Sequence, residues 1–329
     1  PAEETEPEDS VERFVLSFAG DCTFGYTITP EGSGGNFPSI VGTDYSYPLA
    51  NVAQYFLNDD YTLVNLECCL TYYTPTEEEM ESMGLATKRF RFKGLPAYAQ
   101  ILSCSGVEFA SCCNNHSLDF GWTGWSNTLS ALADVGVGYA GYGKTWVATT
   151  ESGLTIGVAA YSFYVTEANL RSTISSLREQ GAEVVIISLH GGTEGSYSPT
   201  ENQIRNSRLA IDCGADIVFG HHTHTLLPVE YYGDGVIYYG LGNFSFAGNT
   251  YPSDMDSAIL QQEILRAQDG TISLGALTMI PCSMSSITTQ NNYQPTPYQT
   301  SDEGYDRALS KLLGLYAGDD LYVSYRDDD

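Results

Sequence analysis

Short apolar runs that end in polar loops are the feature that most constrains how this sequence can fold. Such runs are typical of buried strands, and helical segments separate most of them in the first two thirds of the chain. Strand character is found at residues 14–19, 61–66, 107–113, 146–149, 154–161, 183–189 and 216–219. Helical character is found at residues 48–57, 95–103, 121–134, 172–180 and 199–212. The alternation predicts an α/β fold with parallel β-α-β units.

The C-terminal third has a different pattern. Strand-like runs at residues 236–239, 257–265 and 272–280 follow one another with no helix between them, which predicts a second, more antiparallel sheet. No composition shift marks an internal boundary, so we expect a single domain over residues 13–329. Its last part, residues 283–329, is expected to be irregular apart from one helix.

Residues 1–12 are rich in acids and lack an apolar pattern, which predicts a solvated linker or disordered tail. The first residue is Pro1 rather than Met. We therefore expect an extracellular or cell-surface protein of bacterial type, anchored by a removed N-terminal segment. An ordinary frayed terminus is the alternative.

The charge balance excludes one class of partner. Lys and Arg number 14 against 41 Asp and Glu, a formal net charge of −27. Such a chain repels a phosphate backbone, and its one basic run, residues 88–93, is short, so we expect no nucleic-acid partner. The sequence has no run of about 18 apolar residues, so we expect no membrane span in it. The eight cysteines form no C-x-x-C motif, and we expect mostly free thiols.

All five histidines follow predicted strands: His116, His190, His221, His222 and His224. Open α/β sheets build their binding sites at the carboxyl ends of strands. A single loop histidine is usually structural, but five in this position favour a metal site. His222 and His224 are two residues apart and can face the same side of an extended segment.

Residues with side-chain oxygen atoms lie at the ends of the same strands or just after them. They are Asp21 after the first strand, Asn65 and Glu67 at the second, Asn114, Asn115 and Asp119 after the third, and Glu194 after His190. Imidazole, carboxylate and amide ligands suit Mn, Fe or Zn. A bridging carboxylate can hold two such ions about 3.5–4 Å apart, where they activate water and bind phosphoryl oxygens. We therefore expect one or two divalent metal ions.

Seven motifs in order resemble the CapA family of poly-γ-glutamate capsule synthesis proteins, a branch of the calcineurin-like metallophosphatase superfamily. They are FAGDCTFG (18–25), VNLE (64–67), FKGLPAYAQIL (92–102), CNNHSLDFG (113–121), LHGGTEGSYSPTENQ (189–203), LAIDCGADIVFGHHTH (209–224) and YYGLGNFSF (238–246). The resemblance implies a four-layer α/β/β/α sandwich of two mixed sheets.

The resemblance also implies roles for individual residues. The metal ligands would be Asp21, Glu67 as the bridging carboxylate, Asn115, His190, His222 and His224. His116 and Asp119 would be catalytic, with a purely structural His116–Asp119 hydrogen bond as the alternative. Asn65, Asn114, Glu194 and His221 would form a second layer that orients the ligands.

Two positions depart from the superfamily pattern. The first motif of the superfamily is Asp-x-His. Here the residue two positions after Asp21 is Thr23, so one metal would lose a nitrogen ligand. The family often carries an arginine where this chain has Gly25-Tyr26. Arg89, Arg91 or Lys93 could replace it, although a solvated run of charges is the simpler interpretation.

Three functions fit this sequence. The first is a cell-surface metal-dependent hydrolase, most simply a phosphoesterase, acting on an anionic small molecule or polymer. The second is a non-catalytic component that binds or exports the capsule polymer, working with other capsule-synthesis membrane proteins. The third is an amide hydrolase or transferase acting on polyglutamate. We further expect the acidic excursion over residues 71–89 to lie over or beside the site and to be mobile.

Overall fold

The computed structural model describes residues 11–29 and 32–323. The acidic linker expected over residues 1–12 lies outside the described residues up to residue 10, and the first strand begins at Glu12. Among the residues that are described, no helix is long and apolar enough to cross a membrane.

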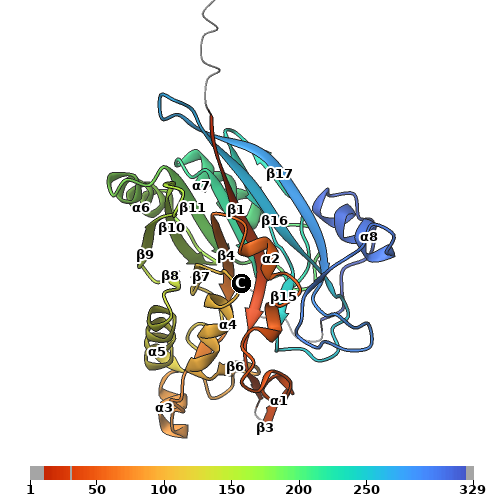
Figure 1. Cartoon of the computed structure of the whole chain (residues 1–329). Helices are drawn as coiled ribbons and strands as arrows, with labels where there is room; N and C mark the ends of the chain where they lie inside the picture. The colour runs from red at the N-terminus through yellow and green to blue at the C-terminus, as the bar shows by residue number, and fades with distance from the viewer. Residues whose placement is uncertain (1–10, 30–31, 324–329) are drawn as a thin grey trace, which may run out of the picture.

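The first large sheet has eight strands, in the order β18-β17-β16-β1-β4-β7-β8, with β15 paired to β1 (Figure 1). β4 and β15 run parallel to β1, and β16 runs antiparallel to it, so the sheet is mixed. Its strands are β1 (Glu12–Thr23), β4 (Tyr61–Leu66), β7 (Phe109–Ser111), β8 (Gly138–Ala140), β15 (Asn243–Phe246), β16 (Asp256–Arg266), β17 (Ile272–Ser283) and β18 (Thr296–Pro297).

The second large sheet has the order β13-β14-β12-β11-β10-β9. Its four central strands are parallel, and β9 and β13 run antiparallel at the two edges. The strands are β9 (Thr145–Thr149), β10 (Thr155–Ser162), β11 (Val184–His190), β12 (Ile217–His221), β13 (Val229–Tyr232) and β14 (Gly235–Tyr238). A small sheet, β3-β2-β6-β5, is built from β2 (Tyr26–Thr29), β3 (Gly32–Gly34), β5 (Cys69–Leu70) and β6 (Arg91–Gly94).

The two large sheets pack face to face through an apolar core. Phe18 of β1 lies at its centre, with its ring 5.2 Å from that of Phe219 on β12 and 5.1 Å from that of Tyr238 on β14. Fully burying one such side chain stabilises the fold by about 1.5–3 kcal/mol. This interior fixes the two sheets relative to each other, and with them the ends of their strands.

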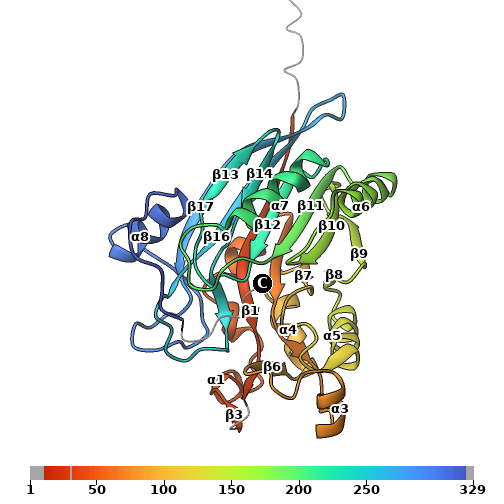
Figure 2. The ribbon, with the colours of Figure 1, turned by 180° about the vertical axis from the view of Figure 1, so that it is seen from behind.

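Helices cover the outer faces of both sheets, and Figure 2 shows those that lie over the second sheet. The first sheet is covered by α1 (Phe37–Val41), η1 (Tyr47–Leu49), α2 (Ala53–Phe56), η2 (Pro96–Tyr98), α4 (Ala99–Ser103) and α5 (Gly121–Asp134). The second is covered by α6 (Glu167–Glu179) and α7 (Glu201–Asp212), and α8 (Glu303–Leu312) packs on β16 and β17. The four-layer α/β/β/α sandwich is therefore confirmed.

One topological expectation was wrong. The C-terminal strands do not form a separate antiparallel sheet, because β16 pairs along β1 from Glu12–Arg266 to Ala19–Ile259 and extends the first sheet. β14 instead joins the second sheet, parallel to β12. The expected helix over residues 48–57 is also broken into η1 and α2.

The cysteine prediction is confirmed. All eight cysteines are free, and the two adjacent pairs at residues 68–69 and 112–113 are buried. Burial raises the pKa of Cys22 to about 12, so that thiol stays protonated and packs as a small apolar side chain.

Candidate metal centre

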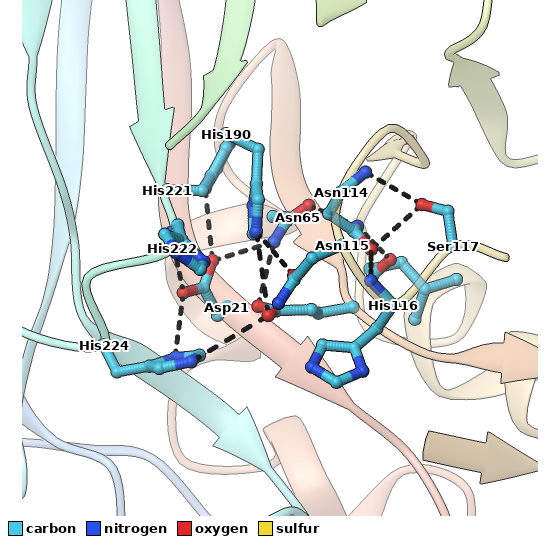
Figure 3. Close-up of polar contacts among 12 residues, drawn as sticks. Asp21, Asn65, Asn114, Asn115, His116, Ser117, His190, His221, His222 and His224 are labelled. Carbon is cyan, nitrogen blue, oxygen red and sulfur yellow. Dashed lines mark hydrogen bonds and ion pairs between the residues drawn. The ribbon is translucent and has the colours of Figure 1, made fainter. Parts of the chain in front are cut away.

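The carboxyl ends of neighbouring strands bring polar side chains side by side. In the first sheet Asp21 of β1 is in register with Asn65 of β4 and Asn243 of β15. In the second sheet His190 of β11 is in register with His221 of β12. Because the two sheets pack face to face, both rows meet at one edge of the sandwich (Figure 3).

A glycine permits the close approach that places Asp21. A Cβ atom on Gly20 would lie 2.0 Å from the carbonyl oxygen of Gly242, so only glycine fits between β1 and β15. The adjacent backbone N–H of Asp21 donates to that oxygen at 2.9 Å. The Gly-Asp motif therefore sets the position of the carboxylate through the backbone.

The loop after β12 holds two histidines in strained conformations. His222 and His224 have φ values of 96° and 57°, in the left-handed region that residues other than glycine rarely adopt. Such strain persists where the surrounding structure enforces it, and it clusters at functional sites. It turns both imidazoles toward the carboxylates of the first sheet (Figure 3).

Glu67 lies between two groups of ligand-type atoms. Its Oε1 is 3.8 Å from Nε2 of His190 and 3.9 Å from Nε2 of His224. Glu67, His190 and His222 form one group whose ligand atoms lie within 4.8 Å of one another, and Asp21, Glu67 and His224 form a second. The side-chain oxygen of Asn115 is 2.9 Å from Nε2 of His190 and so adjoins the first group.

The two carboxylates have opposite pKa shifts. Burial raises the pKa of Glu67 well above its usual value, and the neighbouring charge of Asp21 adds to this. Burial acts on Asp21 in the same direction, but hydrogen bonds from His221 and His224 outweigh it and hold the pKa of Asp21 well below its usual value. Without a cation, the site disfavours a negative charge on Asp21 and on Glu67 at the same time.

The histidines respond to the same environment. Burial, with a contribution from neighbouring His222, lowers the pKa of His190 well below its usual value. Burial also acts to lower the pKa of His224, but the charges of Glu67 and Asp21 dominate and raise it to about 10. The cluster thus attracts positive charge at the Glu67–Asp21–His224 side and offers a neutral imidazole at His190, as a metal ligand requires.

A chain of amides orients the two carboxylates. The Asn65 side-chain NH₂ donates to Asp21 at 2.9 Å and to Glu67 at 3.3 Å. Asn114 in turn donates to the Asn65 oxygen at 3.0 Å and accepts from the Ser117 hydroxyl at 2.9 Å. These contacts attach both amides to the carboxylates, and the orienting role of Asn65 and Asn114 stays a prediction.

His116 belongs to neither of the two ligand groups and lines a pocket beside them. Its Nδ1 is 2.9 Å from Asp119, which also accepts from Lys88 Nζ at 2.6 Å and from the backbone N–H of Phe92 at 2.6 Å. Asp119 is fully buried, so three donors hold a carboxylate that in turn fixes the imidazole. His116 and His224 both line a pocket of about 370 Å³.

The remaining predicted residues occupy distinct places. Buried His221 directs Nδ1 to Asp21 at 3.3 Å, on the oxygen that Asn65 also contacts. Buried Glu194 lines the pocket with His116. Thr23 supplies no metal ligand in place of the superfamily histidine, and its hydroxyl accepts from the backbone N–H of Gly248 at 3.1 Å.

The basic run at residues 88–93 contributes through a residue that the sequence did not single out. Arg91 contacts Met80, and Lys93 donates to Thr74 at 2.6 Å, so both face the excursion over residues 71–89. Lys88 instead donates to Asp119 and to the backbone oxygen of Asn115, which places the end of the excursion beside the site. Its middle forms the exposed helix α3 (Glu77–Ser82); its mobility stays a prediction.

Two further residues of the site were missed. Asn243 contacts Nδ1 of His224 at 2.9 Å, and its position inside the YYGLGNFSF motif was the available signal. Phe163, at φ 57°, packs its ring 5.2 Å from that of His222. No pattern around Phe163 distinguished it from an ordinary loop aromatic.

The residues present fit a divalent cation. Glu67 Oε1, the oxygen that faces Nε2 of His190 and of His224, is buried without a hydrogen-bond partner among the described residues, which is costly unless a further group satisfies it. The contact of Asn243 with Nδ1 of His224 leaves Nε2 facing Glu67, the arrangement that supports a metal-ligating histidine. Imidazole, carboxylate and amide donors together suit Mn, Fe or Zn.

Comparisons with known proteins agree with the site's motifs. The family described as "Bacterial capsule synthesis protein PGA_cap" matches residues 15–247. The chain is 24% identical over 278 residues to the capsule biosynthesis protein CapA of Bacillus anthracis, covering 77% of this chain and 64% of that protein. It is 29% identical over 237 residues to the PGA biosynthesis protein CapA of Bacillus subtilis, covering 65% and 60%. The chain thus spans less than two thirds of the length of these relatives.

A solved structure was also matched. It is the NAD nucleotidase of Haemophilus influenzae, with a TM-score of 0.44 and 12% sequence identity, covering 93% of this chain and 63% of that one.

Proposed function

The chain belongs to the PGA_cap family of bacterial capsule synthesis proteins, and from that premise we propose that it is a metal-dependent phosphoester hydrolase. The observation that carries the proposal is the convergence of Asp21, Glu67, Asn115, His190, His222 and His224, with Glu67 shared between two groups of ligand atoms. A shared carboxylate between two such groups is the arrangement of two-metal hydrolytic sites.

Each group would hold one cation. Asp21, Glu67 and His224 would bind the first, and Glu67, Asn115, His190 and His222 the second. A divalent cation, when bound, supplies Lewis-acid activation of water and neutralises charge on phosphoryl oxygens. The first cation would have three ligand residues and the second four. The first group has fewer because Thr23 stands where the superfamily has a histidine and offers no imidazole.

His116 would protonate the leaving group. Water would attack phosphorus and release a proton to solvent, the ester P–O bond would break, and the departing oxygen would take a proton from the protonated imidazole of His116, which solvent then reprotonates. Asp119 holds Nδ1 of His116, and His116 lines the pocket, so the ring is fixed beside the space that a leaving group would occupy. Such general acid catalysis contributes typically about 10²–10⁴-fold in rate.

We place this activity in capsule synthesis at the cell surface, next to other capsule-synthesis membrane proteins. Support comes from the names of the relatives, which are called capsule or PGA biosynthesis proteins. The substrate would be an anionic small molecule or polymer that presents a phosphoester. A non-catalytic role in polymer binding or export, or hydrolysis of polyglutamate amide bonds, is the outcome if phosphoesters are not turned over.

The test is turnover of an aryl phosphate by chelator-treated protein after addition of Mn²⁺, Zn²⁺ or Fe²⁺. We expect activity only with added metal, its loss in His222→Ala, and full activity in Ser172→Ala, a control on the exposed face of α6. Metal binding without turnover of any phosphoester would contradict the proposed reaction. Failure to bind metal would contradict the site itself.

A further inference from the structure

A lysine at the end of the excursion over residues 71–89 reaches the surroundings of His116. The Lys88 side chain is 19% exposed, and its Nζ donates to Asp119 Oδ1 at 2.6 Å and to the backbone oxygen of Asn115 at 2.5 Å. Both acceptors lie outside the excursion. Lys88 therefore links the excursion to the loop that carries the residue proposed to protonate the leaving group.

The two acceptors hold His116 at two points. The Asn115 oxygen belongs to the peptide unit that joins Asn115 to His116. Asp119 Oδ2 lies 2.9 Å from Nδ1 of the imidazole, and the ring nitrogen is the donor because an ionised carboxylate only accepts hydrogen bonds. One ammonium thus fixes both the backbone before His116 and the partner of its ring. Such fixation matters in a reacting group, because a misplacement of about 1 Å can cost about 10²-fold in rate.

Asp119 is a buried charge that Lys88 compensates. Its side chain is fully buried, and it also accepts from the backbone N–H of Phe92 at 2.6 Å. A buried carboxylate is costly unless it is paired and hydrogen-bonded. Without the ammonium, the charged partner left among these contacts would be His116 itself. The loss of Lys88 therefore bears directly on the imidazole.

A second contact seats the excursion on the same loop. The N–H of Asp119 donates to the oxygen of His116, and the turns that follow lead to Gly121, whose φ is 61°. A Cβ atom on Gly121 would lie 2.4 Å from Sδ of Met83, so the glycine allows the methionine to pack there. Met83 and Lys88 thus reach the loop from one segment, and the path of that segment places the ammonium.

We propose that Lys88 is a positioning residue, which holds the Asp119–His116 pair in the orientation in which His116 gives its proton to the departing oxygen. The inference rests on the proposed hydrolase function for the role of His116. Lys88 acts through Asp119 and the peptide unit before His116, and not on the substrate. Its loss should therefore matter most where the departing oxygen most needs a proton.

Two aryl phosphates with different leaving groups separate this role from a purely structural one. The phenolate of dinitrophenyl phosphate departs without a proton, whereas that of phenyl phosphate benefits from one. With Mn²⁺-loaded protein, Lys88→Met should lower kcat/KM by about 10-fold or more for phenyl phosphate, but by less than about threefold for dinitrophenyl phosphate. A disturbed fold or metal site would lower both alike.

Lys93→Met is the matched control. Lys93 belongs to the same basic run, but its ammonium donates to Thr74 in the excursion at 2.6 Å, so the variant removes the same charge and should change the ratio of the two rates by less than about twofold. In the Asp119→Asn background, Lys88→Met should add less than about twofold, because the charge that it compensates is gone. Lys88→Gln keeps a donor without the charge and should show the same split between substrates if Lys88→Met folds poorly.

A measurement without turnover separates the inference from the hydrolase function. In Zn²⁺-loaded protein labelled with ¹⁵N-histidine, the Nδ1 proton of His116 should give a downfield NMR signal, because it is bonded to a carboxylate, and His116→Asn should remove that signal. We expect Lys88→Met to lose it as well, because the ring is no longer held in one orientation. Lys93→Met should keep it.

Each result decides for or against the positioning role. Equal losses on the two phosphates, an equal effect of Lys93→Met, or unchanged rates in Lys88→Met would overturn it. So would a His116 signal that is absent from the wild type or unchanged in Lys88→Met. A wild type that hydrolyses neither phosphate contradicts the proposed function, and loss of the His116 signal in Lys88→Met would then still support the positioning role.

Discussion

Replacing His116 by asparagine should abolish most turnover and leave metal binding intact. The side chain lies outside both groups of ligand atoms that include Glu67, and its Nδ1 is bonded to Asp119. Loss of a general acid costs about 10²–10⁴-fold in kcat. His222→Ala should instead lose metal, because His222 belongs to one of the two groups.

The contribution of Asp119 can be worked from its contacts. It holds the imidazole by one hydrogen bond of 2.9 Å, while Lys88 and the Phe92 N–H keep the carboxylate in place. A hydrogen bond to a charged group contributes about 1.5–3 kcal/mol, so Asp119→Asn should lower kcat by about 10- to 150-fold. Because Asp119 acts through His116, the double variant should be no slower than His116→Asn alone.

The assay combines kcat on an aryl phosphate, with manganese present, and elemental analysis of the same samples. Lys144→Met, at an exposed lysine in the turn before β9, is the control for surface charge. If His116→Asn loses metal as completely as His222→Ala, then His116 is a ligand and the assignment is wrong. If the effects of His116→Asn and Asp119→Asn multiply in the double variant, Asp119 does not act through the imidazole.

Two further predictions concern the framework around the site. Gly20→Ala should destabilise the fold by about 1–3 kcal/mol and weaken metal binding, because its Cβ would meet the Gly242 oxygen at 2.0 Å; thermal unfolding with and without Mn²⁺ measures both. Burial acts to raise the pKa of Asp256, but Arg307 and Lys311 hold it below its usual value, so its stabilisation is full above about pH 4 and is lost as the pH falls through the folded pKa. Asp256→Asn should therefore lower stability at pH 7 by about 2–3 kcal/mol and flatten the acid side of a Tm-against-pH curve; an unchanged acid side would contradict this.

The elements that were predicted closely are those whose local sequence is self-sufficient. β4 (Tyr61–Leu66) and α5 (Gly121–Asp134) have the expected bounds. The first is an apolar run bounded by acids at both ends, and the second has a repeated apolar face. In place of one helix over residues 48–57, the chain forms the two short helices η1 and α2, and apolar residues of both pack against the first sheet.

Sheet membership could not be predicted from strand order. β16 and β17 follow β14 in sequence, yet β16 pairs with β1, more than 200 residues earlier, as in the pair Phe14–Ile264. The pattern of apolar and polar residues in β16 would suit a strand at the edge of either sheet. Only the resemblance to a known family indicated two mixed sheets.

The site was predicted where residue type and strand-end position coincide. All six expected ligands lie together because parallel strands end at one edge of each sheet and the sheets face each other. Lys88 was missed because a run of basic residues beside an acidic excursion resembles a solvated surface. Its contact with buried Asp119 depends on the path of that excursion, which no local pattern specifies.

The central claim is that Glu67 is shared between two cation sites of unequal strength. A Mn²⁺ titration by equilibrium dialysis, followed by elemental analysis, tests it most directly. We predict about two ions per chain, the tighter one lost in His222→Ala and the weaker one in Asp21→Asn, with both lost in Glu67→Ala. A single ion whose binding is unchanged in Glu67→Ala, or no binding of Mn²⁺, Zn²⁺ or Fe²⁺ by the folded wild-type protein, would contradict the claim.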